Sequence, residues 1–382
     1  MKCRSCGSRE LEIIVALGCT PLANALLASP DAAEETYPLE LAWCPGCTLL
    51  QITESVPPEV LFRDYVYFSS FSDTMLRHAQ EVAEELIHER KLTSSSLVIE
   101  AASNDGYLLQ FFKRAGIPVL GIEPALDVAA AAETKGIRTI NEFFGESLAK
   151  ELDKADLFMA NNVLAHAPDV NEFVAGIRTV LKPDGVAVIE TPYARDMIEK
   201  CEFDTIYHEH VFYYSITALN ALFARHGLML ERVEHIPLHG GSLRVFVRQG
   251  KGGWRVDEPW AGDRGYYAAF SDRIVRLKDA LLGLLDGKDL AAYGAAAKGS
   301  TLLNCFGIRN VRYVVDRNPV KQGKYMPGVR IPICAPQKLL EDRPHYVLLL
   351  AWNLADEILQ QQAEYRRQGG QFIIPVPEPK VV

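Results

Sequence analysis

Four cysteines in two CxxC pairs, Cys3/Cys6 and Cys44/Cys47, most constrain how the N-terminal part of this 382-residue chain can fold. Four thiolates can close a tetrahedron around zinc, and a two-residue spacer lets both sulfurs of a pair converge on one turn. In a reducing compartment such pairs indicate a metal more than disulfides, with buried or redox-active cysteines as the alternative. Because the pairs stand far apart, we expect the zinc site in a larger, loop-rich module over residues 1–75. Because all four ligands are thiolates, no open coordination position is expected, and the zinc ion should be structural.

The overall charge and hydropathy exclude several classes of protein. The formal net charge of −9 argues against a broad basic surface for nucleic acid. The first residues, MKCRSCGSRE, contain no apolar run that could serve as a signal peptide, and no uncharged apolar stretch reaches membrane-spanning length. With 48% hydrophobic residues the composition is typical of a soluble globular protein. We therefore expect a cytoplasmic protein, monomeric or weakly homo-oligomeric, without a nucleic-acid or membrane partner.

From residue 97 onward, short apolar runs of strand length alternate with helical stretches. The runs are LVIEAASNDG, PVLGIEP, ADLFMANNVLA and VAVIETP. This alternation predicts a doubly wound α/β domain over residues 76–250, whose ligands should bind beyond the carboxyl ends of the strands. A glycine-rich, charged stretch, RQGKGGWRVDEPWAGDRG, separates it from a second βα series, which predicts another Rossmann-like domain over residues 251–382.

Polar residues stand at three successive predicted strand ends of the central domain. In VIEAASNDGYLL a strand ends in Glu100, a tight turn follows, and Gly106 leads into a helix, which suits the close approach of a nucleoside-like cofactor. At the next strand end, the carboxylate of Glu123 can accept both hydroxyls of a ribose. Small residues at such turns are often packing devices, but three polar strand ends in order favour a cofactor site. The candidate cofactor-binding residues are Glu100, Ala102, Ser103, Asn104, Gly106, Glu123, Asn161, Asn162 and His166.

These motifs resemble those of class I S-adenosylmethionine methyltransferases. The resemblance rests on the acid, turn and glycine of the first motif and on the ribose carboxylate of the second. Position 102 is alanine where that motif commonly has glycine. A dinucleotide dehydrogenase would usually show GxGxxG at the first turn, and this chain does not. The resemblance implies S-adenosylmethionine as the cofactor and a class I methyltransferase (Rossmann-like) fold for the central domain.

The stretch FDTIYHEH follows the fourth predicted strand and lies on the same rim as the expected cofactor. If the stretch is helical, Tyr207 and His210 share a face, and if it is extended, Tyr207 and Glu209 do. Either arrangement puts a phenol or a carboxylate near an imidazole. Such a group suits proton abstraction next to a carbonyl, with a donor for the developing oxyanion. A surface loop with incidental histidines is the alternative.

Over essentially its full length the chain resembles the sugar C-methyltransferases, which act on nucleotide-linked 4-keto-deoxysugars and form branched-chain sugars. The shared features are, in order, the CxxC pairs, YVYFSSFSDTM, SNDGYLL, ANNVLAH, FDTIYHEH, HGGSLRVF and YGAAAKGSTLLN. Within this context YHEH is specific, whereas none of the other motifs is specific alone. The resemblance implies an N-terminal zinc module, a central cofactor domain and a C-terminal α/β domain that helps to hold the nucleotide sugar.

The same resemblance implies roles for individual residues. The base matches the last histidine of YHEH, the tyrosine and glutamate of that motif are its companions, and His208 is a structural neighbour. A further tyrosine comes from DYVYFSS, where we favour Tyr67 over Tyr65. The implied reaction removes the proton next to the ketone, and the resulting enolate carbon attacks the sulfonium methyl group. The candidate catalytic residues are therefore His210, Glu209, Tyr207 and Tyr67.

Two further motifs are candidate contacts to the substrate. HGGSLRVF combines a flexible turn with a hydroxyl and an arginine, although a β-turn that enters a strand explains it equally well. AAYGAAAKGS is a strand, a small-residue turn and a helix start, so a diphosphate could bind at that helix N-terminus. The alternative is a vestigial nucleotide fold used only for packing. The candidate substrate-binding residues are His239, Ser242, Arg244 and Lys298.

Three other functions stay open at this point. A nicotinamide oxidoreductase would use YGAAAKG and Asp316 as cofactor loop and ribose acid, but the central block has the better-formed cofactor pattern. A zinc-ribbon module that binds RNA or protein is disfavoured by the acidic charge and by the lack of basic, aromatic stripes. The third is a methyltransferase with another small-molecule substrate.

Overall fold

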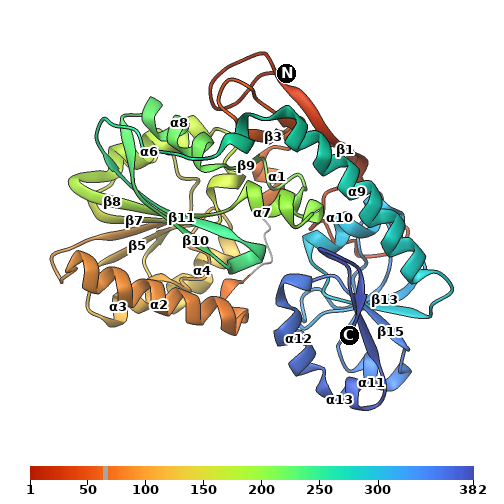
Figure 1. Cartoon of the computed structure of the whole chain (residues 1–382). Helices are drawn as coiled ribbons and strands as arrows, with labels where there is room; N and C mark the ends of the chain where they lie inside the picture. The colour runs from red at the N-terminus through yellow and green to blue at the C-terminus, as the bar shows by residue number, and fades with distance from the viewer. Residues whose placement is uncertain (63–67) are drawn as a thin grey trace.

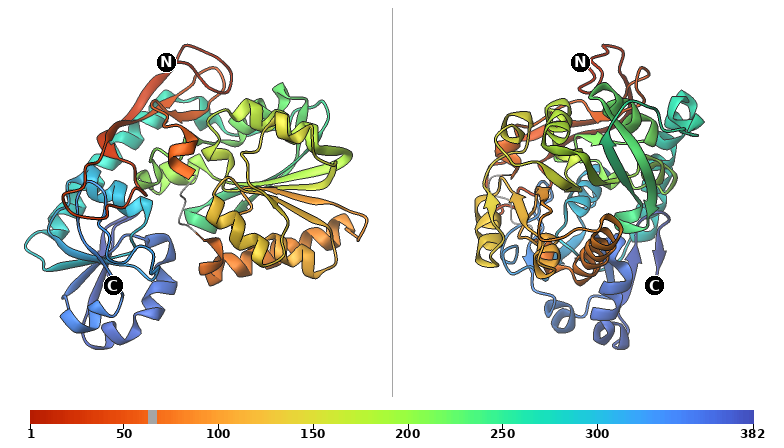
Figure 2. Two further views of the ribbon diagram at one scale, coloured as in Figure 1. Left: turned by 180° about the vertical axis from the view of Figure 1, so that it is seen from behind. Right: turned by 90° about the vertical axis from the view of Figure 1, so that its left-hand side faces the viewer.

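The structure, a computed structural model, describes residues 1–62 and 68–382, of which residues 62 and 239 are described without their side chains. Three β-sheets, one each in the N-terminal, central and C-terminal parts, carry the fold, and helices cover them (Figure 1). The long helix α9 (Arg264–Leu285) extends from the N-terminal strands to the C-terminal sheet in both Figure 1 and Figure 2. Among the described residues, no helix combines the length and the apolar character needed to cross a bilayer.

The N-terminal sheet is antiparallel and has the order β1-β2-β3-β9. Its first three strands come from the expected zinc module, but β9 comes from the stretch directly after YHEH. The YHEH segment is therefore tied to the N-terminal sheet. The bounds are β1 (Glu12–Pro21), β2 (Thr36–Trp43), β3 (Leu50–Ile52), β9 (Phe212–Tyr213), α1 (Pro58–Phe62) and η1 (Ser69–Phe71).

The central sheet has seven strands in the order β10-β11-β8-β7-β4-β5-β6. The five strands from β8 to β6 are parallel, as the doubly wound prediction requires. The last two differ from that prediction because β10 and β11 form an antiparallel hairpin beside β8, and their connection is too short for a parallel crossover. The bounds are β4 (Val98–Ala101), β5 (Val119–Ile122), β6 (Thr139–Ile140), β7 (Ala155–Asn161), β8 (Leu181–Pro192), β10 (Leu228–Ile236) and β11 (Ser242–Gln249).

Helices cover both faces of the central sheet (Figure 2). Side chains of β7 alternate between the faces: Leu157 and Met159 share a buried cluster with α2 and α3, whereas Phe158 and Ala160 share one with α6 and α8. This period of two is what a sheet buried on both sides requires. The helices are α2 (Asp73–Arg90), α3 (Leu109–Arg114), α4 (Leu126–Thr134), α5 (Glu146–Ala149), α6 (Val170–Val180), α7 (Ala194–Glu199) and α8 (Ile216–Arg225), with the short turns η2 (Leu164–His166), η3 (Phe203–Thr205) and η4 (Leu238–Gly240).

The C-terminal sheet has the order β14-β13-β12-β15-β16-β17 and is parallel except for β17. The second α/β unit of the prediction is therefore present. The bounds are η5 (Pro259–Gly262), β12 (Leu290–Tyr293), α10 (Ala297–Phe306), β13 (Val311–Val315), β14 (Ile333–Cys334), α11 (Lys338–Asp342), β15 (Tyr346–Leu349), η6 (Trp352–Leu354), α12 (Ala355–Gln361), α13 (Ala363–Arg367), β16 (Gln371–Ile374) and β17 (Lys380–Val381).

A buried ion-pair network locks α2 and the β10–β11 hairpin onto β8. Glu190 of β8 accepts hydrogen bonds from His78 Nε2 of α2 at 2.9 Å and from Arg244 Nε of β11 at 2.8 Å. Both side chains of the Glu190–Arg244 pair are buried, so neither charge has water to compensate it. Burial alone would raise the pKa of Glu190, but hydrogen bonds and charge from His78 and Arg244 lower it.

Replacing Arg244 should destabilise the fold strongly. Arg244→Ala leaves the buried Glu190 carboxylate with only His78, and breaking a buried pair in this way costs about 3–5 kcal/mol. Urea unfolding followed by circular dichroism measures that loss in the free energy of unfolding. Arg367→Ala, which removes an exposed ion pair to Glu364, is the control and should cost about 1 kcal/mol or less. Equal losses for both variants would contradict this account of the network.

Candidate active site

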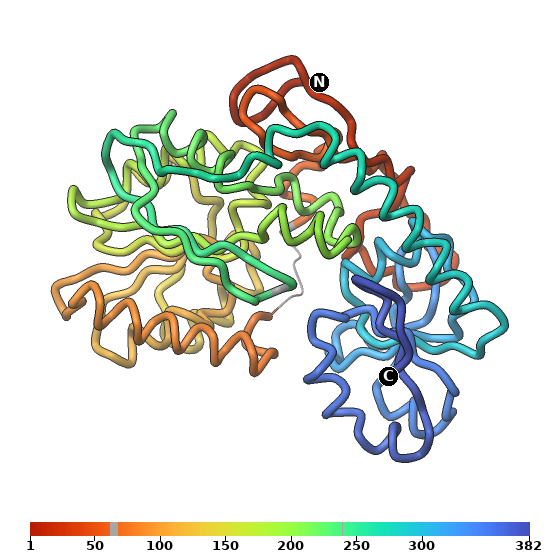
Figure 3. The backbone as a smooth tube through the Cα atoms, viewed as in Figure 1, coloured from red at the N-terminus to blue at the C-terminus, as the bar shows by residue number. Residues whose placement is uncertain are grey.

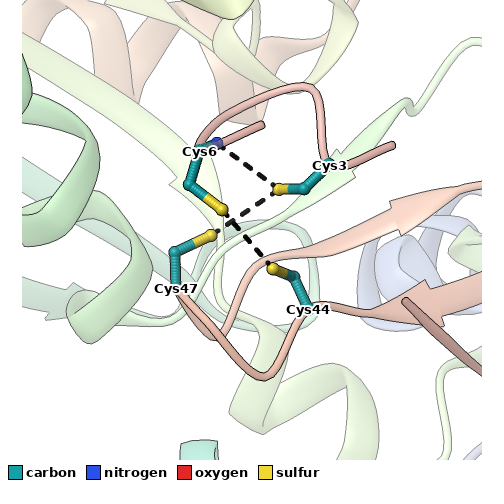
Figure 4. A group of neighbouring side chains, drawn as sticks. All are labelled: Cys3, Cys6, Cys44 and Cys47. Atoms are coloured by element: carbon teal, nitrogen blue, oxygen red, sulfur yellow. Dashed lines mark hydrogen bonds between the residues drawn. The ribbon is translucent and has the colours of Figure 1, made fainter. Parts of the chain in front are cut away.

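The four CxxC cysteines converge on one point between two short turns (Figure 4). The Sγ atoms of Cys3 and Cys47 are 3.7 Å apart, those of Cys6 and Cys44 are 3.6 Å apart, and all four lie within 4.8 Å of one another. Four sulfurs at about 2.3 Å from a tetrahedral zinc ion stand about 3.8 Å apart. The donor set and its spacing therefore fit zinc, and four thiolates leave no ligand position for catalysis.

The first motif forms a tight loop after β4, with Ala102 and Asn104 in the left-handed backbone region (φ 53° and 50°). The backbone at Ala102 is the conformation that glycine adopts easily, so the turn persists although this chain carries a Cβ there. Asn104 Oδ1 accepts a hydrogen bond from Ser69 N at 2.8 Å, which ties the segment before α2 to this loop. Ala102 and Asn104 both line a cavity of about 660 Å³, whose other walls are described below.

Glu100 and Ser103 lie beneath this loop and are fully buried. Neither the carboxylate oxygens of Glu100 nor the hydroxyl of Ser103 has a hydrogen-bond partner within the described residues. Burial raises the pKa of Glu100 well above its usual range, and the neighbouring acids Glu123, Asp105 and Glu190 add to the effect. Their positions fix the floor of the loop, since neither residue lines the cavity itself.

Glu123, at the end of β5, faces the same loop. Its Oε2 accepts from Asn104 N and its Oε1 from Ala125 N, each at 2.9 Å. Burial raises the pKa of this carboxyl, while the two backbone donors oppose that effect. Each oxygen has a further lone pair, and the side chain lines the cavity. The residues at the first two strand ends therefore fit a nucleoside, because a carboxylate is presented where ribose hydroxyls would need an acceptor.

The third strand end brings Asn161, Asn162 and His166 to the cavity wall. Asn161 Oδ1 has no hydrogen-bond partner among the described residues. His166 Nδ1 donates to Glu209 O at 2.7 Å, and its ring meets that of His210 edge-on at 4.8 Å between centroids. Burial lowers the pKa of His166 to about 4, so this imidazole is neutral near pH 7 and acts as a support for the turn beside it.

The YHEH segment is a turn, and it brings Tyr207 and His210 together as the helical alternative predicted. Tyr207 Oη lies 2.8 Å from His210 Nε2, and His210 N donates to Tyr207 O at 2.9 Å. His210 Nδ1 lies 2.9 Å from Thr205 O, and since a carbonyl only accepts, Nδ1 carries the proton. Nε2 is then the basic nitrogen. Tyr207 and His210 both line the cavity.

Glu209 and His208 lie away from the cavity. Glu209 is buried, its two oxygens accept from Asn24 Nδ2 at 2.9 and 2.7 Å, and burial raises its pKa to about 7. His208 Nε2 lies 3.1 Å from Pro38 O, and this buried imidazole faces the N-terminal sheet. The structural role expected for His208 stays a prediction.

One cavity of about 660 Å³ joins these groups, and residues from all three parts of the chain line it. Tyr67 and Tyr65 lie outside the described residues, as does the side chain of His239. The predicted site residues that line the cavity are Ala102, Asn104, Glu123, Asn161, Asn162, His166, Tyr207, His210 and Lys298. The predicted residues that do not line it are Glu100, Ser103, Gly106, Glu209, Ser242 and Arg244.

The HGGSLRVF motif is explained by packing more than by contact with the cavity. Arg244 serves the buried network with Glu190, and the hydroxyl of Ser242 donates to Leu238 O at 3.0 Å. A Cβ at Gly240 would come within 2.4 Å of the Glu202 carboxylate, and φ at Gly240 is +100°. The glycine therefore lets the turn pass directly over that acid.

An acidic group beside Lys298 was not among the predicted site residues. Glu202 lines the cavity, and burial raises its pKa to about 7, with Lys298 opposing. Asp204 accepts from Trp352 Nε1 at 2.7 Å, and Lys298 Nζ lies 4.3 Å from the Trp352 ring centre. Glu202 and Asp204 precede the histidines of FDTIYHEH by a few residues, and this position could have identified them from the sequence. Asn24 was also missed, and nothing in the sequence pairs it with Glu209.

Comparison with known proteins places the chain in a family. A family described as C-methyltransferase C-terminal domain matches residues 237–377, a methyltransferase domain matches 75–233, and a zinc binding domain matches 3–62. The C-methyltransferase NovU of Streptomyces niveus is 36% identical to the chain, over 100% of the chain and 96% of NovU. The chain belongs to the C-methyltransferase family. It is an S-adenosylmethionine-dependent methyltransferase with a zinc-binding cysteine cluster.

More distant proteins match a smaller share of this C-methyltransferase. The ubiquinone biosynthesis O-methyltransferase of Bradyrhizobium sp. (strain ORS 278) is 30% identical over 25% of the chain and 39% of its own length. Among solved structures, magnesium protoporphyrin IX methyltransferase from Synechocystis PCC 6803 is 14% identical and covers 52% of this chain and 100% of its own, with a TM-score of 0.40.

Removing one thiolate should release the zinc of this C-methyltransferase. Purified protein should carry about one zinc per chain, and Cys44→Ser should lose it and destabilise the N-terminal part, because a structural zinc contributes directly to folding. Metal analysis and thermal unfolding measure the two effects. Cys19→Ser, at an exposed cysteine outside the cluster, is the control and should keep the metal. A metal-free protein that is fully folded would contradict the assignment.

The carboxylate of Glu123 should hold the cofactor ribose. Glu123→Ala should weaken S-adenosylmethionine binding by about 1.5–3 kcal/mol, the range for hydrogen bonds to a charged group. Calorimetric titration with the cofactor gives the affinity directly. Glu142→Ala, at an exposed acid after the next strand, should bind as the unmodified enzyme does. An unchanged affinity for Glu123→Ala would place the ribose elsewhere.

Proposed function

We propose that this C-methyltransferase methylates the carbon next to the ketone of a nucleotide-linked 4-keto-6-deoxysugar, in the biosynthesis of a branched-chain sugar. The observation that supports this proposal most is the Tyr207–His210 pair. This pair lies on the wall of a cavity that is also lined by residues at the strand ends expected to bind the cofactor and by residues of the C-terminal α/β unit. A sugar with a ketone and a nucleotide at opposite ends would use all of these surfaces.

In this proposal His210 is the base. Its Nε2 is the nitrogen without a proton, because Nδ1 donates to Thr205 O, so Nε2 can take the proton from the carbon next to the ketone. The carbon–hydrogen electron pair then moves into the enolate. Because Nε2 carries no proton, the Tyr207 hydroxyl donates to it at 2.8 Å in the structure. In the proposed step this hydroxyl turns to donate to the ketone oxygen of the substrate, which frees the Nε2 lone pair for the proton and stabilises the enolate oxygen. Bound S-adenosylmethionine supplies the electrophilic methyl group that the enolate carbon takes up.

The protein surroundings support this proton transfer. His166 is neutral near pH 7, and its donated hydrogen bond holds the carbonyl of the residue before His210. A neutral imidazole beside His210 does not repel the imidazolium that forms when the proton is taken up. Residues from all three parts of the chain line the cavity, and where a bound substrate displaces water from it, hydrogen bonds to a developing oxyanion are stronger than in water.

We assign the nucleotide of the substrate to the part of the cavity wall that the C-terminal α/β unit, residues 251–382, provides. The N-terminus of α10 faces the cavity through Ala296, Ala297 and Lys298, and Lys321 lines the same wall. Backbone N–H groups at a helix start together with lysine side chains are suited to a diphosphate. Asp316 accepts from Ala295 N at 2.8 Å, which fixes the turn before α10.

The proposal is tested by substrate screening with a matched pair of variants. Nucleotide-linked 4-keto-6-deoxysugars are incubated with enzyme and S-adenosylmethionine, and NMR of the product locates the new methyl group. His210→Asn should lower turnover on the order of 10²-fold or more while both ligands still bind, which is typical of losing a positioned base. His208→Asn, at the buried imidazole that faces the N-terminal sheet, should lose much less. Full turnover by folded His210→Asn would exclude His210 as the base.

A further inference from the structure

A side chain from the N-terminal zinc module reaches the YHEH turn. Asn24 lies in the connection between β1 and β2, and its Nδ2 donates to both carboxylate oxygens of Glu209, at 2.9 and 2.7 Å. One amide nitrogen thus lies within hydrogen-bond distance of both oxygens of one carboxylate. Asn24 itself lines the cavity, whereas Glu209 does not. Asn24 and Glu209 are far apart in the sequence, so their contact exists only in the folded molecule.

The connection that carries Asn24 is fixed by its neighbours on both sides. It starts and ends in paired strands of the N-terminal sheet, and Leu27 forms a β-bridge with Tyr325 of the C-terminal unit. Glu34, near its end, pairs with Arg330 at 3.1 Å. Figure 3 shows this part of the red trace beside the C-terminal unit. Asn24 therefore has a defined position relative to the turn it contacts.

We propose that Asn24 is a positioning residue of the methyl-transfer reaction, which holds the Glu209 carboxylate in place and in its ionised form beside the catalytic turn. This inference rests on the proposed role of the Tyr207–His210 turn. It gives the N-terminal module a direct task in the reaction, in addition to its structural metal. No step of the proposed proton transfer passes through Asn24, because a side-chain amide is neither an acid nor a base near neutral pH.

The charge state of Glu209 depends on few groups. Burial raises its pKa to about 7, and the Asn24 side chain, the Asn24 backbone and the Lys321 ammonium lower it. His166, from η2, faces the backbone carbonyl of Glu209 and is neutral near pH 7. The other titratable groups of the YHEH turn itself are Tyr207, His208, which faces the N-terminal sheet, and His210. Without Asn24 the carboxyl would lose donors to its charged form, so its pKa would rise further.

An ionised Glu209 matters because the base becomes a cation. When His210 takes up a proton, a negative carboxylate in the same turn stabilises the imidazolium, and a protonated carboxyl does not. Activity should therefore fall as the pH drops through the pKa of Glu209, in addition to the fall caused by protonation of the base His210 itself. The acid limb of the pH profile should lie near pH 7 in the unmodified enzyme. Losing the Asn24 donors should move that limb to higher pH.

The test measures the titration of Glu209 and the pH profile in the same variants. Protein labelled with ¹³C at glutamate side-chain carboxyls reports the titration by NMR, and the signal that Glu209→Gln removes is that of Glu209. Asn24→Ala and the isosteric Asn24→Asp should raise the Glu209 titration by about one pH unit or more, as expected when hydrogen bonds to a charged group are lost. The acid limb of the pH profile of kcat/KM should move together with the Glu209 titration.

Two controls distinguish a positioning role of Asn24 from a general loss of structure in the N-terminal zinc module. Glu34→Gln breaks the ion pair to Arg330 in the same connection without touching Glu209, and should leave both measurements unchanged. In a Glu209→Gln background, Asn24→Ala should have no further effect on the pH profile, because the group it acts through is gone.

The outcomes distinguish this inference from the proposed substrate. If folded Asn24→Ala and Asn24→Asp leave the Glu209 titration and the acid limb in place, the inference is wrong even where sugar methylation is observed. If the titration moves but none of the nucleotide-linked sugars is methylated, the contact stands and the proposed substrate fails. A titration that moves while the acid limb of an active enzyme stays fixed would also overturn the positioning role.

Discussion

The placement of residues 202–214 is the constraint on which the rest of the site depends. This segment has little regular structure of its own, so contacts from outside fix it. Strand β9 joins the N-terminal sheet, Trp352 of the C-terminal unit donates to Asp204, and Asn24 donates to Glu209. All three parts of the chain thus hold the turn that presents Tyr207. The N-terminal strands and the C-terminal α/β unit thus both contribute contacts that hold this turn beside the central domain.

The charges around the cavity follow from the same arrangement. Burial raises the pKa of the acids Glu202 and Glu209 to about 7, while it lowers that of the His166 imidazole to about 4. Each shift disfavours the charged form, which is the effect of removing water from a group. The few donors and cations that remain, such as Asn24 and Lys298, therefore decide which groups are charged. A site of this kind responds to pH near neutrality through its acids as well as through its base.

Much of this architecture could be predicted from local patterns. The cysteine spacing, the alternation of apolar runs and the polar strand ends each depend on nearby residues, and the structure contains all of them. What local patterns could not show are pairings between distant segments. Arg244 was expected at the substrate, but it faces Glu190 across a strand pair. The Asn24–Glu209 contact and the addition of β9 to the N-terminal sheet have no local signal either. The individual catalytic roles remain predictions.

Proton abstraction before methyl transfer is the central claim of this account, and solvent exchange measures it most directly. The enzyme is incubated in D₂O with a nucleotide-linked 4-keto-6-deoxysugar and S-adenosylhomocysteine, which carries no methyl group to transfer, and NMR follows the carbon next to the ketone. The account predicts that the unmodified enzyme introduces deuterium at that carbon and that His210→Asn does not. A folded His210→Asn enzyme that exchanges and methylates normally would contradict it.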